Sequence, residues 1–261
     1  MKGLARIYVC VFSLCLSALI PGLANAAGVL SENIRISSQL LGYELQYRVY
    51  RPERITADLR LPLLFVTDGQ WYLEYGNMKQ VLDREIAAGH IRPLIAVFVD
   101  SRNPDNLSEN RRLKEFFCNV DYAGFFAREL VPRVSKDWPV SSRREDRVIM
   151  GLSFGAVNAA CFGLMLNNIF AGVAMQSPAN DQHLDVLRDL YKKEDRKPVR
   201  IFLSFGTQKE DNIAAGRRFK RTLAAKGYDL TYREVDEGHN WKNWGPLIDD
   251  ALRTFFVPQE D

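Results

Sequence analysis

The chain has 261 residues, of which 47% are apolar, and a formal net charge of +3. A chain of this size can bury one sizeable core, and no composition shift marks a linker, so we expect one domain over residues 27–261. The near balance of 35 basic and 32 acidic residues provides no excess of positive charge for phosphate backbones. We therefore expect no nucleic-acid partner.

The first 26 residues differ in character from the rest of the chain. Lys2 and Arg6 precede an uncharged run over 7–20, and the small residues Ala24-Asn25-Ala26 follow. This pattern is typical of a secretory signal peptide over 1–26, cleaved after Ala26. The run is short for a bilayer span of about 20 residues, so we expect no stable membrane insertion after cleavage. The predicted location is periplasmic or secreted.

Two cysteines, Cys118 and Cys161, remain after the predicted cleavage. They could pair in an oxidising compartment. Cys161, however, lies in a predicted helix and resembles an ordinary small buried residue. We predict two free thiols.

Apolar runs and helical patterns alternate along the mature chain. We predict strands over 33–38, 43–50, 61–67, 93–99, 148–150, 171–176, 199–205 and 230–235, and helices over 71–88, 122–138, 157–166, 212–226 and 244–256. The first two strands form a hairpin around Leu41-Gly42, and the polar segment 100–110 is expected to be a long loop that shapes a site. The alternation predicts an α/β fold, with a mostly parallel twisted sheet and helices on both faces.

The sequence Gly151-Leu152-Ser153-Phe154-Gly155 stands between a predicted strand and a predicted helix. A serine on a sharp strand-to-helix turn needs glycines two residues away on each side, because the two backbones approach closely there. This spacing predicts that Ser153 is a nucleophile.

A serine hydroxyl needs a general base, most often histidine. His90 falls in a helix-to-strand connection, at the edge of the sheet opposite Ser153, and is expected to be a surface residue. His183 follows a strand end without any further signal. His239 comes directly after the last predicted strand, and the order of serine before a late histidine favours it as the base.

The orienting acid is expected between these two residues, in the segment 206–212. This segment contains Glu210 and Asp211, and the sequence does not choose between them. We favour Glu210 slightly, because Asp211 and Asn212 could instead cap the following helix, and we keep Asp211 as the alternative.

An oxyanion hole requires donors aimed at the charge of the tetrahedral intermediate. The backbone N–H of Phe154 is the first expected donor, and the second is expected from Gly69, Gln70 or Trp71, with Gln70 preferred. Asp68 is expected to stabilise that turn rather than to act as a catalyst. We expect no cofactor and no metal ion.

Several segments together resemble the esterase family of α/β-hydrolases that includes enterochelin esterases, S-formylglutathione hydrolases, feruloyl esterases and mycobacterial mycolyltransferases. The resemblance covers essentially all of the mature chain and rests on the segments 65–70, 126–132, 151–155 and 238–241, together with Arg112, Glu115 and Trp244. It implies the α/β-hydrolase fold, Ser153 as nucleophile, His239 as base, and an acid in the loop after Gly206. Members with an acidic residue three positions after that glycine would place it at Lys209, so a Ser-His dyad stays open as well.

The resemblance also suggests substrates. We expect an exported serine esterase that forms an acyl-serine intermediate on a small-molecule ester, with a siderophore ester of the enterochelin type as first candidate. Trp71, Arg112 and Trp241 are the expected substrate-binding residues, with Arg102 and Arg111 as further cations that could equally be a solvated face. A feruloyl or acetyl ester of a carbohydrate, an acyltransferase and a non-catalytic binding protein are the alternatives.

Overall fold

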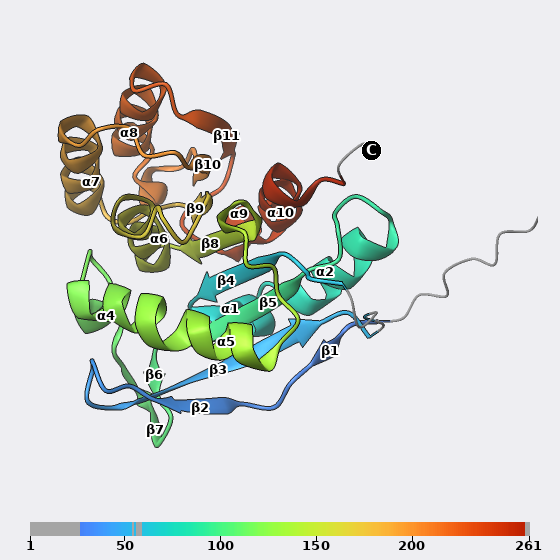
Figure 1. Ribbon diagram of the computed structural model, residues 1–261. Helices are drawn as coiled ribbons and strands as arrows, with labels where there is room; N and C mark the ends of the chain where they lie inside the picture. Colours follow the sequence, from blue (N-terminus) through green and yellow to red (C-terminus); the bar gives the residue numbers. More distant parts are fainter. Residues whose placement is uncertain (1–26, 54, 56–58, 259–261) are drawn as a thin grey trace, which may run out of the picture.

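The computed structural model in Figure 1 describes residues 27–258, apart from 54 and 56–58. The predicted signal peptide over 1–26 lies outside the described residues. Among the helices that the structure does describe, none is both long enough and apolar enough to cross a bilayer.

The centre of the molecule is a sheet of nine strands within the described residues. Its strands are β1 (Val29–Leu30), β2 (Ile34–Ser37), β3 (Glu44–Arg51), β4 (Leu63–Thr67), β5 (Ile95–Asp100), β8 (Arg147–Leu152), β9 (Gly172–Gln176), β10 (Arg200–Gly206) and β11 (Asp229–Val235). The order is β1-β3-β5-β4-β8-β9-β10-β11, with β2 paired to β3. The strands from β5 to β11 in this order run parallel, whereas β1, β2 and β3 pair antiparallel.

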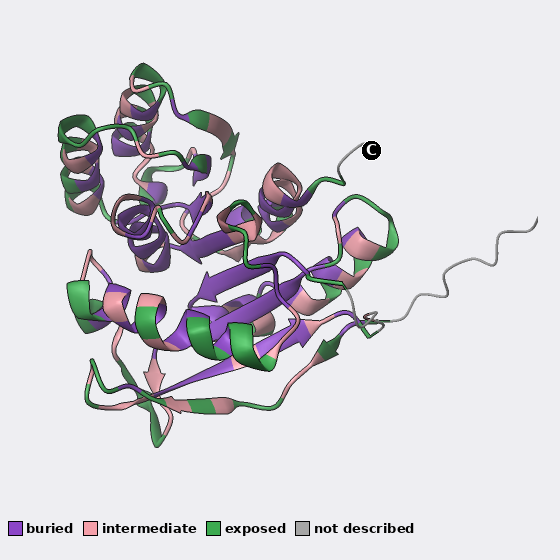
Figure 2. Cartoon of the chain, viewed as in Figure 1, coloured by how far each residue is buried: buried purple, intermediate pink, exposed green. Residues whose placement is uncertain are grey.

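Helices cover both faces of this sheet. They are α1 (Gly69–Glu74), α2 (Met78–Ala87), α3 (Arg112–Glu115), α4 (Val120–Phe125), α5 (Val131–Asp137), α6 (Phe154–Met165), α7 (Asp181–Lys193), α8 (Ile213–Ala225), α9 (Trp241–Trp244) and α10 (Ile248–Phe256). Buried side chains of α4 to α8 share one core layer, and those of α2, α9 and α10 share the other. Figure 2 shows the resulting burial pattern: the central strands are buried along their length, while the helices alternate between buried and exposed residues. The predicted α/β class and the opening hairpin are thus confirmed.

One predicted helix, over 71–88, is in fact two helices, α1 and α2. The chain turns at Gly76 and Asn77, and Asn77 has a φ of 47°. A Cβ on Gly76 would lie 2.8 Å from the Trp241 ring. This close contact requires a glycine at the point where the chain turns between the two helices.

The predicted helix over 122–138 contains a π-helical segment, Phe126–Leu130, between α4 and α5. The widened turn precedes Pro132, which has no N–H to donate to the preceding turn. Glu129 within it accepts hydrogen bonds from Ser38 Oγ and from the backbone of Gln39, so this segment fastens the opening hairpin.

Two further elements differ from expectation. The polar segment 100–110 is not a plain loop, since it forms the hairpin of β6 (Arg102–Asn103) and β7 (Asn106–Asn110). Helix α7 was missed, although Leu184, Leu187 and Tyr191 are buried at helical spacing. Its start is capped by Asn180, which closes a capping box with His183.

Cys118 and Cys161 form a disulfide bond, so the prediction of two free thiols was wrong. Phe117 and Cys118 both have positive φ values, 57° and 60°, which turn the chain so that Cys118 faces α6. This local turn has no signal in the sequence pattern and explains the error.

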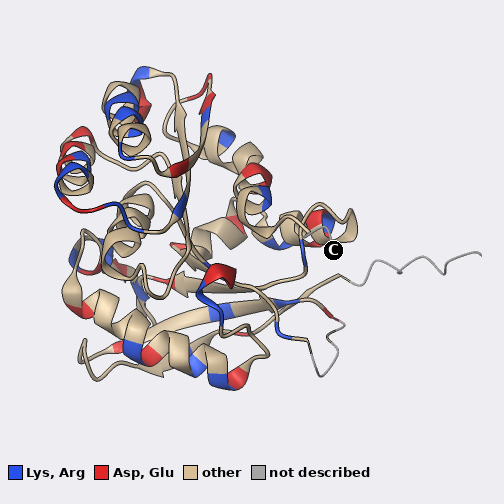
Figure 3. Ribbon diagram, turned by 45° about the horizontal axis from the view of Figure 1, so that its top comes forward, with Lys and Arg blue, Asp and Glu red and all other residues tan. Residues whose placement is uncertain are grey.

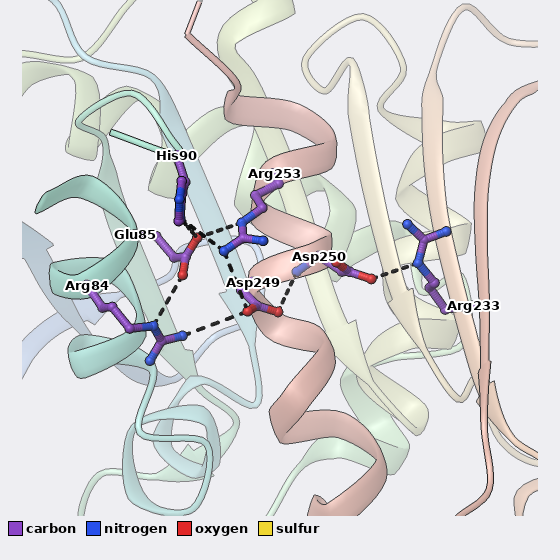
Figure 4. A network of polar contacts seen from close by, with 7 residues as sticks. All are labelled: Arg84, Glu85, His90, Arg233, Asp249, Asp250 and Arg253. Carbon is purple, nitrogen blue, oxygen red and sulfur yellow. Dashed lines mark hydrogen bonds and ion pairs between the residues drawn. The ribbon is translucent and has the colours of Figure 1, made fainter. Parts of the chain in front are cut away.

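Helix α10 is joined to α2 by a network of charged side chains (Figure 4). Glu85, whose side chain is 1% exposed, accepts hydrogen bonds from Arg253 Nε at 2.7 Å and from Arg84 Nε at 3.2 Å. His90 Nδ1 lies 3.2 Å from the same carboxylate. The network joins the C-terminal helix to α2, and His90 is exposed, which is the surface position expected for it.

Candidate active site

Ser153 lies at the sharp turn between β8 and α6, with a φ of 53° and a ψ of −120°. A Cβ on Gly151 would lie 2.2 Å from the carbonyl oxygen of Gly155, and one on Gly155 would lie 2.8 Å from a carboxylate oxygen of Asp68. The close crossing of strand and helix therefore requires Gly151, and the Asp68 carboxylate packed against the start of α6 requires Gly155. The backbone around Ser153 has the geometry that the glycine spacing predicts.

His239 follows β11 and faces Ser153. Its Nε2 lies 2.9 Å from Ser153 Oγ, and its Nδ1 lies 2.5 Å from Oδ1 of Asp211. A carboxylate only accepts hydrogen bonds, so Nδ1 carries the proton and Nε2 presents its lone pair to the serine hydroxyl. The arrangement is a serine-histidine-aspartate triad in geometry.

The acid in this triad is Asp211 and not Glu210, which the sequence favoured slightly. Glu210 is exposed, whereas Asp211 is completely buried. Both residues belong to the same short 3-10 turn, Lys209–Asp211, in which neighbouring side chains point in different directions. Asn212, with a φ of 56°, occupies the N-cap position of α8, although its side chain makes no capping hydrogen bond.

The other carboxylate oxygen of Asp211, Oδ2, is held by three donors. Ser177 Oγ donates at 2.6 Å, Asn243 Nδ2 donates at 2.8 Å, and the backbone N–H of Gly206 is the third. Trp244 Nε1 donates to Ser177 Oγ at 2.9 Å and so fixes the direction of that hydroxyl. The buried charge is thereby fully hydrogen-bonded, and Oδ1 is left to His239.

The expected oxyanion donors lie at the starts of two helices. Phe154 is the first residue of α6 and Gln70 the second of α1, positions at which an α-helix leaves backbone N–H groups without internal partners. The N–H of Trp71 donates to the carbonyl of Asp68 at 3.0 Å and is not available. Asp68, with a φ of 57°, makes the turn into α1, which is the structural role expected of it.

Arg112 connects this turn to the site. Its Nη2 donates to Asp68 Oδ2 at 2.7 Å, and its guanidinium lies 4.7 Å from the centre of the Trp71 ring. Burial raises the pKa of Asp68 to about 6, although the Arg112 charge opposes this rise. Arg112 therefore sits against a carboxylate on one side and aromatic rings on the other, among them Phe154 at 5.3 Å.

A cavity of about 260 Å³ opens over Ser153 and His239. Its other lining residues are Trp71, Tyr75, Arg112, Leu152, Trp241 and Trp244. The three residues predicted to bind substrate, Trp71, Arg112 and Trp241, all line it. The wall is mainly aromatic, with one cation beside the serine.

Other residues considered from the sequence lie elsewhere. Arg102 is held by Asp100 at 2.8 Å, and Arg111 is held by Glu109 at 2.9 Å, so neither lines this cavity. His183 packs on Phe117, with ring centres 4.1 Å apart, and accepts a hydrogen bond from the backbone of Asn180. Within the described residues, no cluster of three or more histidine, cysteine, aspartate or glutamate side chains is arranged to hold a metal ion.

Sequence reasoning missed the supporting residues Asn243, Trp244 as a donor, and Tyr75. Ser177 had a signal, since it follows a strand whose end lies at the same edge of the sheet as Ser153. Asn243 lies four residues after His239, on α9, and its buried amide also donates to the carbonyl of Gly238.

Comparison with known proteins gives the family. The family described as "Putative esterase" matches residues 38–255, most of the chain. The chain belongs to this family. Its fold is the α/β-hydrolase fold: a ferulic acid esterase superposes with a TM-score of 0.75 at 20% identity, over 88% of this chain and 98% of that one. The enterobactin esterase of Shigella flexneri superposes with a TM-score of 0.76 at 24% identity, over 86% of this chain and 58% of that one.

Among curated sequences, the uncharacterized protein YjcH of Bacillus subtilis is 27% identical to this esterase-family chain over 226 residues, which cover 83% of this chain and 93% of that protein. The iron(III) enterobactin esterase of Dickeya dadantii is 27% identical over 206 residues, 72% of this chain. The match spans only 46% of that protein's length.

Proposed function

We propose that this esterase-family protein is a serine hydrolase that cleaves carboxylic esters with Ser153 as nucleophile, His239 as general base and Asp211 as orienting acid. The observation that carries the proposal is the continuous chain of hydrogen bonds from Ser153 Oγ through His239 to Asp211, at 2.9 and 2.5 Å. The chain lies at the carboxyl ends of the parallel strands, where α/β folds gather their functional groups.

In this mechanism Ser153 Oγ attacks the ester carbonyl carbon while His239 Nε2 takes the hydroxyl proton. The carbonyl oxygen becomes an oxyanion that the backbone N–H groups of Phe154 and Gln70 stabilise, each donor contributing about 3 kcal/mol. The tetrahedral intermediate collapses, His239 returns the proton to the departing alkoxide, and an acyl-serine remains. A water molecule then repeats the sequence and releases the acid.

The test is hydrolysis of p-nitrophenyl acetate and butyrate. Ser153→Ala and His239→Ala should each abolish turnover. Asp211→Asn should lower kcat by about 10³ to 10⁴, because it disturbs the histidine tautomer, whereas the matched change Glu210→Gln should leave kcat within about twofold because that residue is exposed. Full activity in a folded Ser153→Ala protein would refute the mechanism.

A binding protein and an acyltransferase are distinguished from a hydrolase by two measurements. A fluorophosphonate probe should label the wild type and not the Ser153→Ala variant. A non-catalytic binding protein would be labelled in neither form. Adding alcohol acceptors to the ester assay measures how the acyl group is divided between water and the alcohol. Predominant transfer to the acceptor at low acceptor concentration would identify an acyltransferase.

We further propose that the acyl group carries an aromatic ring, as in a siderophore or feruloyl ester. Support comes from the aromatic wall of the cavity and from Arg112, which could pair with a phenolate or carboxylate. In a panel of an enterochelin-type trilactone, methyl ferulate, acetylated xylan and p-nitrophenyl acetate, the first two should have the highest kcat/KM. Arg112→Gln should lower kcat/KM more for these two substrates than for p-nitrophenyl acetate. The acetate ester is thus the control substrate for the same variant.

Export is also proposed. The pattern of residues 1–26 and the Cys118–Cys161 disulfide, a bond that persists in oxidising compartments, both favour it. Amino-terminal sequencing of the protein from a cell fractionation should start at Ala27 in the exported fraction. Intact protein confined to the cytosol would contradict this location.

A further inference from the structure

A second cavity, of about 430 Å³, lies at the amino-terminal edge of the parallel sheet. Five arginines line it: Arg92, Arg143, Arg144, Arg196 and Arg200. We call it the arginine cavity. Three carboxylates, those of Glu145, Asp146 and Asp229, share its wall, so it carries two more positive than negative groups.

The arginine cavity is separate from the candidate active site. Arg143 and Arg144 begin the short 3-10 turn that leads into β8, and Ser153 comes directly after that strand. Six residues of extended strand place the two sites about 20 Å apart on opposite edges of the sheet. No residue lines both cavities.

Asp146 is shared by two of the arginines, and neither contact is close. Arg92 donates two long hydrogen bonds, from Nη1 and Nη2, to Asp146 Oδ1 at 3.4 Å, and Arg143 lies 3.8 Å from Oδ2. Oδ2 already accepts a short hydrogen bond from Ser141 Oγ, at 2.7 Å. The Nε of Arg92 is buried and has no hydrogen-bond partner among the described residues. Asp146 therefore leaves much of the hydrogen-bonding capacity of both guanidinium groups unused.

The next two arginines are paired still more weakly. Arg144 lies 3.9 Å from Glu145, and its hydrogen bond goes to the uncharged carbonyl of Pro198. Arg196 is exposed and forms no ion pair within the described residues. Among the residues that the structure describes, only Arg200 of these five has a close carboxylate, Asp229, at 2.8 Å.

Several arginines elsewhere on the surface are paired closely. Distances of 2.7 Å join Arg35 to Asp105, Arg217 to Glu234 and Arg233 to Asp250. Figure 3 shows the general pattern, in which basic and acidic residues are interspersed along the helices. The arginine cavity departs from it, because four guanidinium groups line one hollow and no carboxylate of the described part of the chain lies nearer to them than 3.4 Å.

We propose that the arginine cavity binds a ligand bearing two or more phosphate groups. The planar guanidinium fork matches phosphate oxygens, and several forks around one hollow favour a multivalent anion over a single charge. Two phosphate groups would balance the excess of positive charge and use the free N–H groups. Soluble oligophosphates and the phosphate headgroups of a lipid surface share this chemistry.

The direct test is a calorimetric titration, in which sodium tripolyphosphate is added to the purified protein at low salt. One site per chain is expected. The double variant Arg143→Ala/Arg196→Ala should bind at least tenfold more weakly. Both side chains are exposed and hold no close ion pair, so the variant should fold, which circular dichroism checks. The matched control Arg128→Ala/Arg221→Ala removes the same charge from exposed positions outside the cavity and should change the Kd less than twofold.

A vesicle arm separates the two sources of phosphate. Co-sedimentation with phosphatidylglycerol vesicles but not with phosphatidylcholine vesicles, lost in the cavity variant and kept in the control, would identify a lipid surface. Tripolyphosphate binding without sedimentation would identify a soluble ligand. The proposal is overturned if the wild type binds neither probe, or if the cavity variant binds as tightly as the control. Ester hydrolysis should be the same in all these proteins, so this outcome is independent of the proposed function.

Discussion

Asn243 donates to the same oxygen of Asp211 that Ser177 contacts, and this leaves the opposite oxygen to His239. The direction of the buried carboxylate is thus set by residues that never touch the serine. Asn243 lies on α9 and Ser177 at the end of β9, so two separate elements determine it. Under the proposed mechanism they are positioning residues.

Removing the Ser177 hydroxyl should therefore slow catalysis without abolishing it. A hydrogen bond to a charged group contributes about 1.5 to 3 kcal/mol, so Ser177→Ala should lower kcat about tenfold or more while KM changes little. Steady-state kinetics with p-nitrophenyl butyrate measures this split. Ser204→Ala is the matched control, because Ser204 is equally buried and its hydroxyl has no hydrogen-bond partner in the part of the chain that the structure describes. An equal effect of the two variants would contradict the positioning role.

The Cys118–Cys161 disulfide should contribute strongly to stability. It joins residues 43 positions apart, and the loop-closure relation gives about 4 kcal/mol for a loop of that length. Cys118→Ser/Cys161→Ser should lower the free energy of unfolding by about that amount in urea titrations. Dithiothreitol should lower it similarly in the wild type and have no effect on the double variant. Equal stability of reduced and oxidised wild type would contradict this role.

Much of the site could be predicted from the sequence, because its signals are local. The glycines around Ser153 and the late position of His239 are constraints on nearby backbone and on chain order. The choice between Glu210 and Asp211 is not local, since it depends on which side chain of one short turn meets the donors of Ser177 and Asn243. Those donors are 34 and 32 residues away in sequence.

The fold was predictable to a similar extent. Alternating apolar runs predicted the parallel strands, because their burial is continuous along each strand. The break at Gly76 and the disulfide depend on contacts between distant elements, such as that of Gly76 with Trp241. Helix α7 is different, because its buried spacing was visible in the sequence.

Glu115 should make stability depend on pH. Burial raises its pKa from 4.5 to about 8, even though Tyr43 donates a hydrogen bond to it at 3.1 Å. The folded chain therefore keeps a proton between these values that the unfolded chain releases, so this group's contribution to stability falls as pH rises through that window. The loss amounts to at most about 1.4 kcal/mol per pH unit.

The Glu115→Gln variant cannot ionise, so its stability relative to wild type should rise steadily between pH 5 and pH 8. Urea unfolding at several pH values measures the difference. Glu109→Gln is the control, since Glu109 is exposed and hydrogen bonds from Asn103 and Arg111 lower its pKa instead. A stability difference between Glu115→Gln and wild type that stays constant with pH would show that the carboxyl group is not protonated in the folded protein.

The Glu85 network between α2 and α10 should affect stability and leave chemistry unchanged. Burial alone would raise the pKa of Glu85, but hydrogen bonds from Arg253, Arg84 and His90 outweigh it and lower the pKa below 4.5. Such a group stabilises the folded chain above its unfolded pKa and loses this effect as pH falls through the folded value. Glu85→Gln should therefore lower the free energy of unfolding by about 2 kcal/mol at pH 7, and by less near pH 3.

The exposed pair of Glu194 and Lys197, 3.4 Å apart, supplies the control, since Glu194→Gln should change stability by less than about 0.5 kcal/mol. At temperatures where both variants are folded, the kcat of each should equal that of the wild type. A large loss of kcat in Glu85→Gln would mean that α10 also determines the position of the loop that carries His239.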